Sequence, residues 1–198
     1  MKSLLQYINE ANESTIDSGM VEAYFNDIRV GLKKAVEAAV DNTNDIVDDI
    51  VGSLGDSAGL VLDKSQIYGS IIEGLLFKNL NNEVGFTYKQ GKENTTDKDF
   101  ICTKTAFSDK VMNKMNAKTF SIQVKTSKNG AAFTSNVSGT TEPSFFILIS
   151  YKKNGYRISL DKAYFGYLTP EDWTVSSKNA KLNTNSFVKS SNKMLFDF

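Results

Sequence analysis

Residues 119–126 read Thr-Phe-Ser-Ile-Gln-Val-Lys-Thr and alternate between polar and apolar side chains. Successive side chains on a β-strand point to opposite faces, so Ile122 and Val124 share one face. Gln123 and Lys125 share the other. The sequence therefore predicts a strand with one buried side and with an amide and an ammonium group projecting together from the opposite side.

An acidic residue stands at the mouth of another predicted strand, about one hairpin upstream. Asp99 directly abuts the apolar run Phe100-Ile101-Cys102, and Asp97 is the competing choice for the acid. A carboxylate there, beside Gln123 and Lys125 on the next strand, is the arrangement needed to hold Mg²⁺ (or Mn²⁺) and a water against a scissile phosphate. The carboxylate would bind the cation, the amide would complete its shell, and the lysine would stabilise the developing charge or tune the water.

The chain before residue 82 has the spacing of amphipathic helices, with apolar residues every three or four positions. One stripe covers 21–39 and is interrupted by Asp41-Asn42-Thr43-Asn44; the next covers 46–54, and a third helix is expected over 66–80. Beyond residue 82 the period becomes two. Strands are expected near 83–89, 99–103, 119–126, 144–151 and 156–160, with Lys153-Asn154-Gly155 as the hairpin turn between the last two. Helices followed by a mostly antiparallel or mixed sheet predict an α/β (α+β) domain.

The C-terminal part contains three further local signals. Residues 164–168 are expected to form a core or a lid beside the sheet. Thr169 and Pro170 predict a capped helical turn, and an edge strand is expected near 194–198.

Composition excludes several classes of site. The chain has 198 residues, one cysteine and no histidine. An internal disulfide, a zinc site, a Ser-His-Asp or Cys-His nucleophile and a histidine-dependent nuclease are therefore excluded. Catalysis must rest on carboxylates, lysines, tyrosines or a hard metal ion. No run approaches the roughly 18 apolar residues of a membrane span, and the N-terminus lacks the apolar core of a secretory signal, so we expect a soluble, cytoplasmic protein.

The net charge of zero hides an asymmetry along the chain. Residues 1–65 carry 12 acidic and 5 basic side chains and residues 66–198 carry 11 and 18, which gives net charges of −7 and +7. This division indicates a polyanion partner for the basic part, although two solvated surfaces of opposite sign would give the same count. The acidic segment 21–55 is also a candidate dimerisation or partner-binding arm that screens the basic part.

Asp99 followed by Gln123-Val124-Lys125 resembles the PD-(D/E)XK signature of the restriction-endonuclease-like nuclease superfamily. The segment Tyr68–Glu73 resembles the helix that supplies an additional glutamate in many of these enzymes. The resemblance covers residues 66 to about 151. It implies a mixed central sheet flanked by helices, here preceded by an N-terminal helical segment. Its metal ligands would be Glu73, Asp99 and Gln123, and Lys125 would assist the attacking water.

The resemblance also implies a function, a Mg²⁺-dependent DNA endonuclease that hydrolyses phosphodiester bonds. Two departures bear on it: no proline precedes Asp99, and Gln123 stands where aspartate or glutamate is usual. A neutral amide oxygen can ligate Mg²⁺ without contributing charge, so the site would depend more on Glu73 and Asp99. Similar Q-x-K sites occur in active members, including the endonuclease subunit of heteromeric transposases. The alternative is a catalytically inactive DNA-binding or virion-internal protein on the same fold.

Each of these residues also has an ordinary structural interpretation. Glu73 could be the solvent side of a helix, Asp99 a turn residue, and Gln123 and Lys125 the wet face of an edge strand. Lysines near the site in sequence are candidate phosphate contacts or ordinary surface. Those predicted to contact DNA are Lys104, Lys128, Lys152 and Lys153.

We divide the chain into a flexible tail or leader (1–20), an acidic helical segment (21–62) and a nuclease-like core domain (63–198). The first eleven residues resemble capsid-targeting leaders of internal head proteins of large tailed phages, with Ile8-Asn9-Glu10 as the cleavage triplet before Ala11. This resemblance implies a phage-encoded protein packaged in the virion; a plain amphipathic turn is the alternative. A homodimer through the N-terminal helices would allow both DNA strands to be cut.

Overall fold

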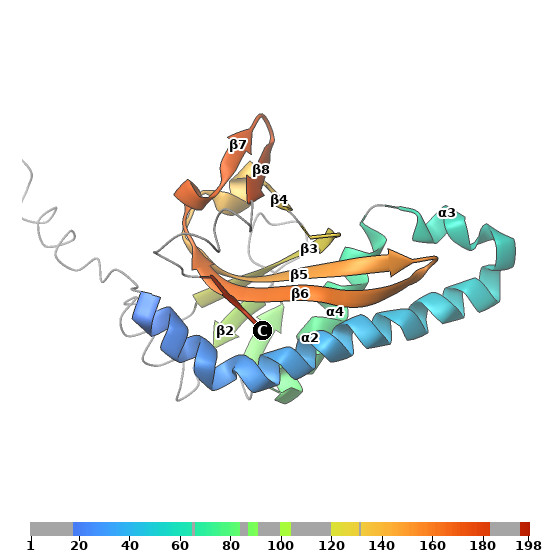
Figure 1. Cartoon of the computed structure of the whole chain (residues 1–198), viewed down its shortest axis with the longest axis horizontal. Coiled ribbons are helices and arrows are strands. Elements are labelled where there is room, and N and C mark those ends of the chain that lie inside the picture. The colour runs from blue at the N-terminus through green and yellow to red at the C-terminus, as the bar shows by residue number, and fades with distance from the viewer. Residues whose placement is uncertain are drawn as a thin grey trace, which may run out of the picture.

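The computed structural model describes residues 18–64, 66–83, 87–90, 100–103, 120–130, 132–182 and 195–198 (Figure 1). Its helical elements are α2 (Ser18–Leu54), η1 (Gly55–Ala58), α3 (Gly59–Leu62), α4 (Ile67–Glu83), η2 (Val137–Thr140) and η3 (Pro170–Asp172). Its strands are β1 (Thr87–Gln90), β2 (Phe100–Thr103), β3 (Phe120–Lys128), β4 (Phe133–Asn136), β5 (Ser144–Asn154), β6 (Arg157–Leu168), β7 (Thr174–Ser176), β8 (Asn179–Leu182) and β9 (Leu195–Asp197).

The strands form two sheets. The larger has the order β1-β2-β3-β5-β6-β9, and the smaller has the order β4-β8-β7. Strands β3 and β5 are parallel, whereas every other pair in the larger sheet is antiparallel. The chain passes from β3 to β5 through β4 and η2, so this crossover builds part of the smaller sheet. The prediction of helices followed by a mixed sheet is confirmed.

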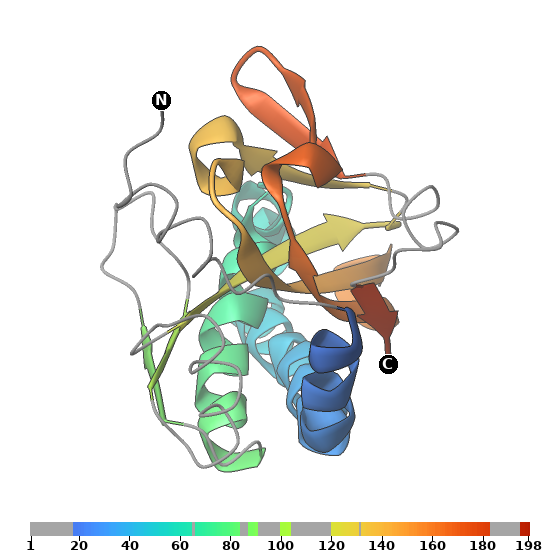
Figure 2. The ribbon, with the colours of Figure 1, turned by 90° about the vertical axis from the view of Figure 1, so that its left-hand side faces the viewer.

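The larger sheet is covered on both faces. Helices α2 and α4 pack on one face, where Ile122, Val124 and Phe145 belong to the main apolar core. The smaller sheet and Trp173 pack on the opposite face, where Phe146 and Leu148 belong to a second core. Figure 2 shows the two helices on one side of the sheet and the β7–β8 hairpin on the other. Because both faces are buried, β5 is apolar along most of its length.

Helix α2 is continuous from Ser18 to Leu54, so the predicted interruption at Asp41–Asn44 is wrong. The reason is that two of these polar residues are buried and bonded. The Thr43 hydroxyl donates to the Ala39 carbonyl at 2.7 Å. The Asn44 amide donates to the Ile158 carbonyl at 2.9 Å and accepts from the Ile158 N–H at 2.8 Å. A residue typical of a helix break therefore joins the helix to the edge of β6.

The apolar stripe of α2 is used within the chain. Tyr24 is 1% exposed and lies 5.6 Å, between ring centroids, from both Phe145 and Phe165. The acidic segment therefore contributes to the same core as residues 63–198, and its apolar side is not free to serve as an arm. Of the exposed acids, Asp48 pairs with Arg157 on β6.

The local signals in the C-terminal half are largely confirmed. Gly155 has φ +59 and lies in the two-residue turn between β5 and β6, where a residue without Cβ adopts that conformation readily. Thr169 and Asp172 form a reciprocal capping box around Pro170. The edge strand near the C-terminus is β9. The segment 164–168 is the end of β6, next to β5 and β9, and its Tyr164, Phe165 and Leu168 are core residues rather than a lid. Strands β4, β7 and β8 were not predicted.

None of the helices in the described part of the chain combines the length and the apolar character needed to cross a membrane.

Replacing Asn44 with alanine tests the link between α2 and β6. The substitution leaves the Ile158 N–H and carbonyl without their partner in a buried place, so we expect a loss of about 2–4 kcal/mol in the free energy of unfolding. Urea unfolding measures the change. Asn42→Ala is the matched control, because Asn42 is exposed two residues earlier in the same helix. Equal stability of the two variants would contradict this assignment.

Candidate active site

One cleft of about 450 Å³ lies between α4 and strands β3 and β4. Gln66, just before α4, lines it with Gly69, Ser70 and Glu73 of α4; β3 contributes Val124, Lys125 and Thr126; β4 contributes Thr134. The cleft therefore joins Glu73 and Lys125, which are 52 positions apart in the sequence. A carboxylate and an ammonium group from different elements line one cavity.

The register of the sheet explains why β3 is accessible here. Among the described residues, β2 pairs with β3 only from Phe100 to Cys102, opposite Ile122 to Phe120. Beyond Ile122, residues 124–126 of β3 line the cleft together with residues of α4 and β4.

Helix α4 approaches β3 at a glycine. A Cβ on Gly69 would lie 2.6 Å from the Thr126 hydroxyl oxygen, closer than real Cβ contacts allow. Gly69 is in the first turn of α4, where glycine is less favourable than alanine by helix propensity. The glycine thus permits the close approach that brings the following turn of α4, with Glu73, to the β3 edge.

Alternation along β3 is as predicted for the residues whose side chains are described. Ile122 and Val124 are 1% and 3% exposed on the helix side. Gln123 and Lys125 have the opposite parity and pair in register with Phe146 and Leu148 of the second core. Gln123 is 6% exposed, so it is a buried amide rather than part of a wet strand face.

The structure unites some of the predicted site residues. Glu73 and Lys125 line the cleft, and Gln123 is two residues before Lys125 on the same strand. Asp99, its alternative Asp97, and Lys104 lie outside the described residues. Phe100, the residue after Asp99, begins β2, and its Cα pairs with that of Ile122 beside Gln123.

Sequence reasoning did not single out Gln66, Ser70 or Thr134, which also line the cleft. Gln66, just before α4, and Ser70 stand seven and three residues before Glu73, the spacing of one helix face, so helical periodicity could have grouped them with the glutamate. Thr134 offered no such signal, because it enters the cleft only through the pairing of β4 with β8.

The oxygen donors suit a hard cation. Glu73 supplies a carboxylate and Gln123 an amide oxygen, and both are ligand types that Mg²⁺ and Mn²⁺ accept. Within the described ranges, no three His, Cys, Asp or Glu residues cluster as a metal-binding group. A metal site here would draw on Gln123 and on Asp99 beyond the described residues.

The lysines predicted to contact DNA have different environments. Lys128 is exposed at the end of β3. The Lys152 ammonium is 2.6 Å from an Asp161 carboxylate oxygen, while its side chain remains 66% exposed. This hydrogen bond lowers the pKa of Asp161 below its ordinary value. Lys153 is held inside a polar network and is only 14% exposed.

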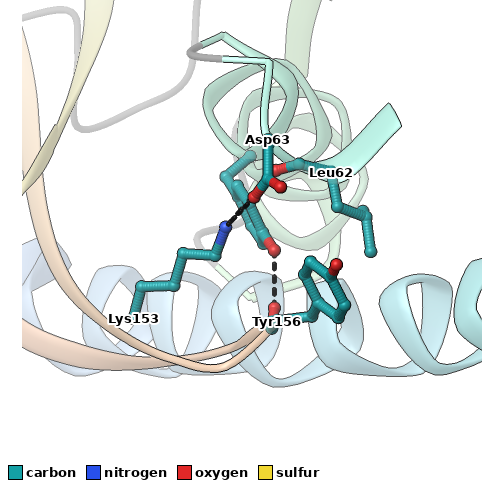
Figure 3. A network of polar contacts seen from close by, with 5 residues as sticks. Leu62, Asp63, Lys153 and Tyr156 are labelled. Carbon is teal, nitrogen blue, oxygen red and sulfur yellow. Dashed lines mark hydrogen bonds and ion pairs between the residues drawn. The ribbon is translucent and has the colours of Figure 1, made fainter. Parts of the chain in front are cut away.

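That network joins the β5–β6 turn to the start of α4 (Figure 3). The Lys153 ammonium is 3.1 Å from an Asp63 carboxylate oxygen and lies 4.9 Å from the Tyr68 ring centroid. The Tyr68 hydroxyl donates to the Tyr156 carbonyl at 2.6 Å. Lys153 therefore stabilises the position of α4, and this geometry does not favour its predicted phosphate contact.

Two groups of this network, Tyr68 and Lys153, have pKa values above their ordinary values. Burial raises the pKa of the Tyr68 phenol, and the neighbouring Lys153 offsets only part of this rise. Desolvation alone would lower the pKa of Lys153, but the hydrogen bond from Lys153 to Asp63, with the other nearby groups, raises it above its ordinary value. A group whose pKa is higher in the folded protein than in the unfolded chain contributes its full stability at pH values below the unfolded-state pKa. That stability is lost as the pH rises through the folded-state pKa.

We therefore expect the free energy of unfolding to fall as the pH is raised above about 10, where tyrosine and lysine normally titrate. Urea unfolding between neutral and alkaline pH measures this loss. Tyr68→Phe removes one titrating group. The free energy of unfolding of this variant should therefore fall less, between neutral and alkaline pH, than that of the unaltered protein. Identical pH dependence would exclude Tyr68 as a contributor.

A matched pair of glycines in α4 tests the close approach to β3. A Cβ added at Gly74 would have no neighbouring atom within 4 Å, so Gly74→Ala should raise stability by about 1 kcal/mol through helix propensity. Gly69→Ala should instead lower it by about 1–2 kcal/mol, because the new methyl overpacks the contact with Thr126.

Thermal and urea unfolding measure both substitutions. Adding Thr126→Ala to Gly69→Ala should restore stability, because the nearest remaining atom, the Thr126 Cβ, lies at an ordinary 3.8 Å. A gain in stability from Gly69→Ala alone would show that α4 does not need this approach.

Comparison with known proteins identifies the fold. No family model and no curated protein matches the chain. Among solved structures, the restriction endonuclease BglI bound to its DNA recognition sequence is similar with a TM-score of 0.60. The two chains are 10% identical, and the match covers 98% of this chain and 93% of that one. The chain therefore has the restriction-endonuclease-like fold, a mixed central sheet flanked by helices and preceded by an N-terminal helix.

Proposed function

We propose that this protein is a divalent-metal-dependent DNA endonuclease that hydrolyses phosphodiester bonds. The observation that carries the proposal is the cleft shared by Glu73 of α4 and Lys125 of β3, with Gln123 on the same strand. The fold shared with BglI, whose crystal structure contains DNA, supports the same assignment.

In this proposal Asp99, the residue before Phe100 in the sequence, completes the site. The Cα of Phe100 pairs with that of Ile122 on β3. Gln123 is the next residue along β3. Glu73, Asp99 and Gln123 would then hold Mg²⁺ or Mn²⁺, which when bound polarises a phosphoryl oxygen and lowers the pKa of a coordinated water. The two carboxylates would supply all the negative charge, because the Gln123 amide is neutral.

Lys125 acts on the reacting phosphate in this proposal. Lys125 is half-buried and lines the same cleft as Glu73. Hydrolysis adds negative charge to the oxygens around phosphorus, and a preorganised cation in a partly desolvated cleft stabilises that charge more than solvent does. The same ammonium group can orient the attacking water. Glutamine at 66 and serine at 70 offer further hydrogen-bonding groups along the cleft wall.

Lys128 is the predicted phosphate contact that the geometry supports best. It is exposed and follows Lys125 by three residues on the strand that lines the cleft. Lys152 would have to exchange its pairing with Asp161 for a phosphate oxygen. The excess of basic side chains in residues 66–198 supports a polyanionic substrate.

The second candidate is a DNA-binding protein without catalytic activity. The observation that favours it is Gln123, a buried neutral amide where the superfamily signature usually has a carboxylate. The first eleven residues, on which phage origin and packaging in a virion depend, lie outside the described residues. A homodimer remains our expectation for cutting both strands with one site per chain. Its contact surface would have to differ from the apolar stripe of α2.

Cleavage of supercoiled plasmid in Mg²⁺, Mn²⁺ or EDTA tests the endonuclease. We expect metal-dependent nicking or linearisation, and a rate lower by about 10²–10³ in Lys125→Ala, the usual effect of removing one preorganised charge-stabilising group. Asp99→Ala and Glu73→Gln should also lose most activity. Lys34→Ala is the control, because Lys34 is an exposed lysine on α2, away from the cleft.

Two results would argue against the proposal in different ways. Unchanged cutting by both Lys125→Ala and Asp99→Ala would show that another site, or a contaminant, does the chemistry. Retention of DNA in a gel shift, with no cutting of supercoiled, linear or single-stranded DNA in any metal, would establish the binding protein instead.

A further inference from the structure

The outer face of the small sheet continues directly from the cleft. In this sheet, Phe133, Ala180 and Leu182 point inward to the second core. The residues between them have the opposite parity and are exposed. They are Thr134 and Asn136 of β4, Thr174 and Ser176 of β7, and Asn179 and Lys181 of β8. We call these six residues the β4–β8–β7 outer face.

Strand register arranges this face in two rows. Thr134 pairs with Lys181, which pairs with Thr174 on the other side. Directly opposed residues on one face have Cβ atoms about 4.5–5.5 Å apart, so Lys181 lies beside Thr134. Since Thr134 lines the cleft, this row begins in the cleft and runs outward across the sheet. Asn136, Asn179 and Ser176 form the second row.

The chemistry of the face matches a phosphodiester backbone. Residues 133–136 and 174–182 contain two lysines, Lys178 and Lys181, and no aspartate or glutamate. Lys178 is exposed in the β7–β8 turn, where its carbonyl accepts a hydrogen bond from Val137 at 3.3 Å. The other side chains of the face are short hydroxyls and amides, the groups that, with lysine and arginine, make most contacts with DNA phosphates.

The dimensions agree with a substrate that extends out of the cleft. Neighbouring strands are about 4.8 Å apart, so a row across three strands spans about 10 Å. That is comparable to the rise of three nucleotides along one DNA strand, at about 3.4 Å each. A strand whose phosphate occupies the cleft would therefore place its next phosphates over this face.

We propose that the β4–β8–β7 outer face binds the DNA backbone within a few nucleotides of the phosphate in the cleft, with Lys181 as its central phosphate contact. This inference rests on the proposed function for the identity of the substrate. It adds a docking surface built by the β3–β5 crossover and the β7–β8 hairpin, on the opposite side of the larger sheet from α2 and α4.

Fluorescence anisotropy with a labelled, mixed-sequence DNA duplex tests the inference on the full chain in EDTA, so that no cutting is needed. The logarithm of the observed binding constant falls linearly with the logarithm of the salt concentration. Removing one lysine–phosphate interaction makes this slope shallower by about 0.9. For Lys181→Gln this corresponds to binding weaker by about eightfold at 0.1 M salt and about fourfold at 0.2 M. Lys181→Arg should retain the slope and the affinity.

Lys34→Gln is the matched control, since it removes the same charge from an exposed lysine on α2. Its binding and slope should equal those of the unaltered protein. Unchanged binding by Lys181→Gln, equal weakening by both variants, or no binding by the unaltered protein would each overturn the inference. Melting temperatures of both variants confirm that the fold is intact.

The two proposals fail separately in this design. A protein that cuts plasmid in Mg²⁺ but binds equally well with Lys181→Gln keeps the endonuclease and loses the docking face. A protein that never cuts, yet binds DNA with the reduced slope in Lys181→Gln, keeps the docking face and loses the endonuclease.

Discussion

The close packing of α4 on the edge of β3 determines where the candidate chemistry lies. A Cβ at Gly69 would lie 2.6 Å from the Thr126 hydroxyl oxygen, so a larger residue there would require the contact to shift. This contact brings the helix within reach of an edge that β2 leaves unpaired beyond Ile122 among the described residues. Glu73 follows Gly69 by about one helical turn and therefore lines the same cleft as Lys125.

The two-sided burial of the larger sheet gives that cleft its character. Apolar cores cover the sheet on both faces, so polar side chains on β3 are exceptions in an otherwise apolar environment. Gln123 is 6% exposed, and placing an amide there costs free energy unless its hydrogen-bonding groups are satisfied. Lys125, two residues after Gln123 on the same strand, lines the cleft. In the proposed function, the partial burial of Lys125 would strengthen its interaction with an anionic phosphate.

The crossover between β3 and β5 has a second role in this architecture. Parallel strands cannot be joined by a tight turn, and here the connection passes through β4 and η2 on the face opposite the helices. Strand β4 then pairs with the β7–β8 hairpin from the C-terminal part of the chain. As a result, Thr134 of β4 lines the cleft, and the exposed polar side chains of β4, β8 and β7 form a surface next to it. Segments that are 40 or more positions apart in sequence thereby become neighbours.

Local and periodic signals in the sequence predicted the elements that depend on near neighbours. The strand alternation at 120–125, the helix at α4, the Gly155 turn and the Thr169 capping box each arise from residues within one or two turns of each other. The same reasoning failed at Asn44, whose amide is satisfied by Ile158, 114 positions away. It also missed the short strands β4, β7 and β8, which are stabilised by pairing rather than by their own propensity. The amino-acid sequence alone establishes which chemical groups are present and which face of each strand or helix they occupy, because side-chain direction follows from backbone periodicity. The cleft shared by Glu73, Lys125 and Thr134 arises only in the folded chain, because it depends on strand order, on register and on the close approach of α4 to β3 at Gly69.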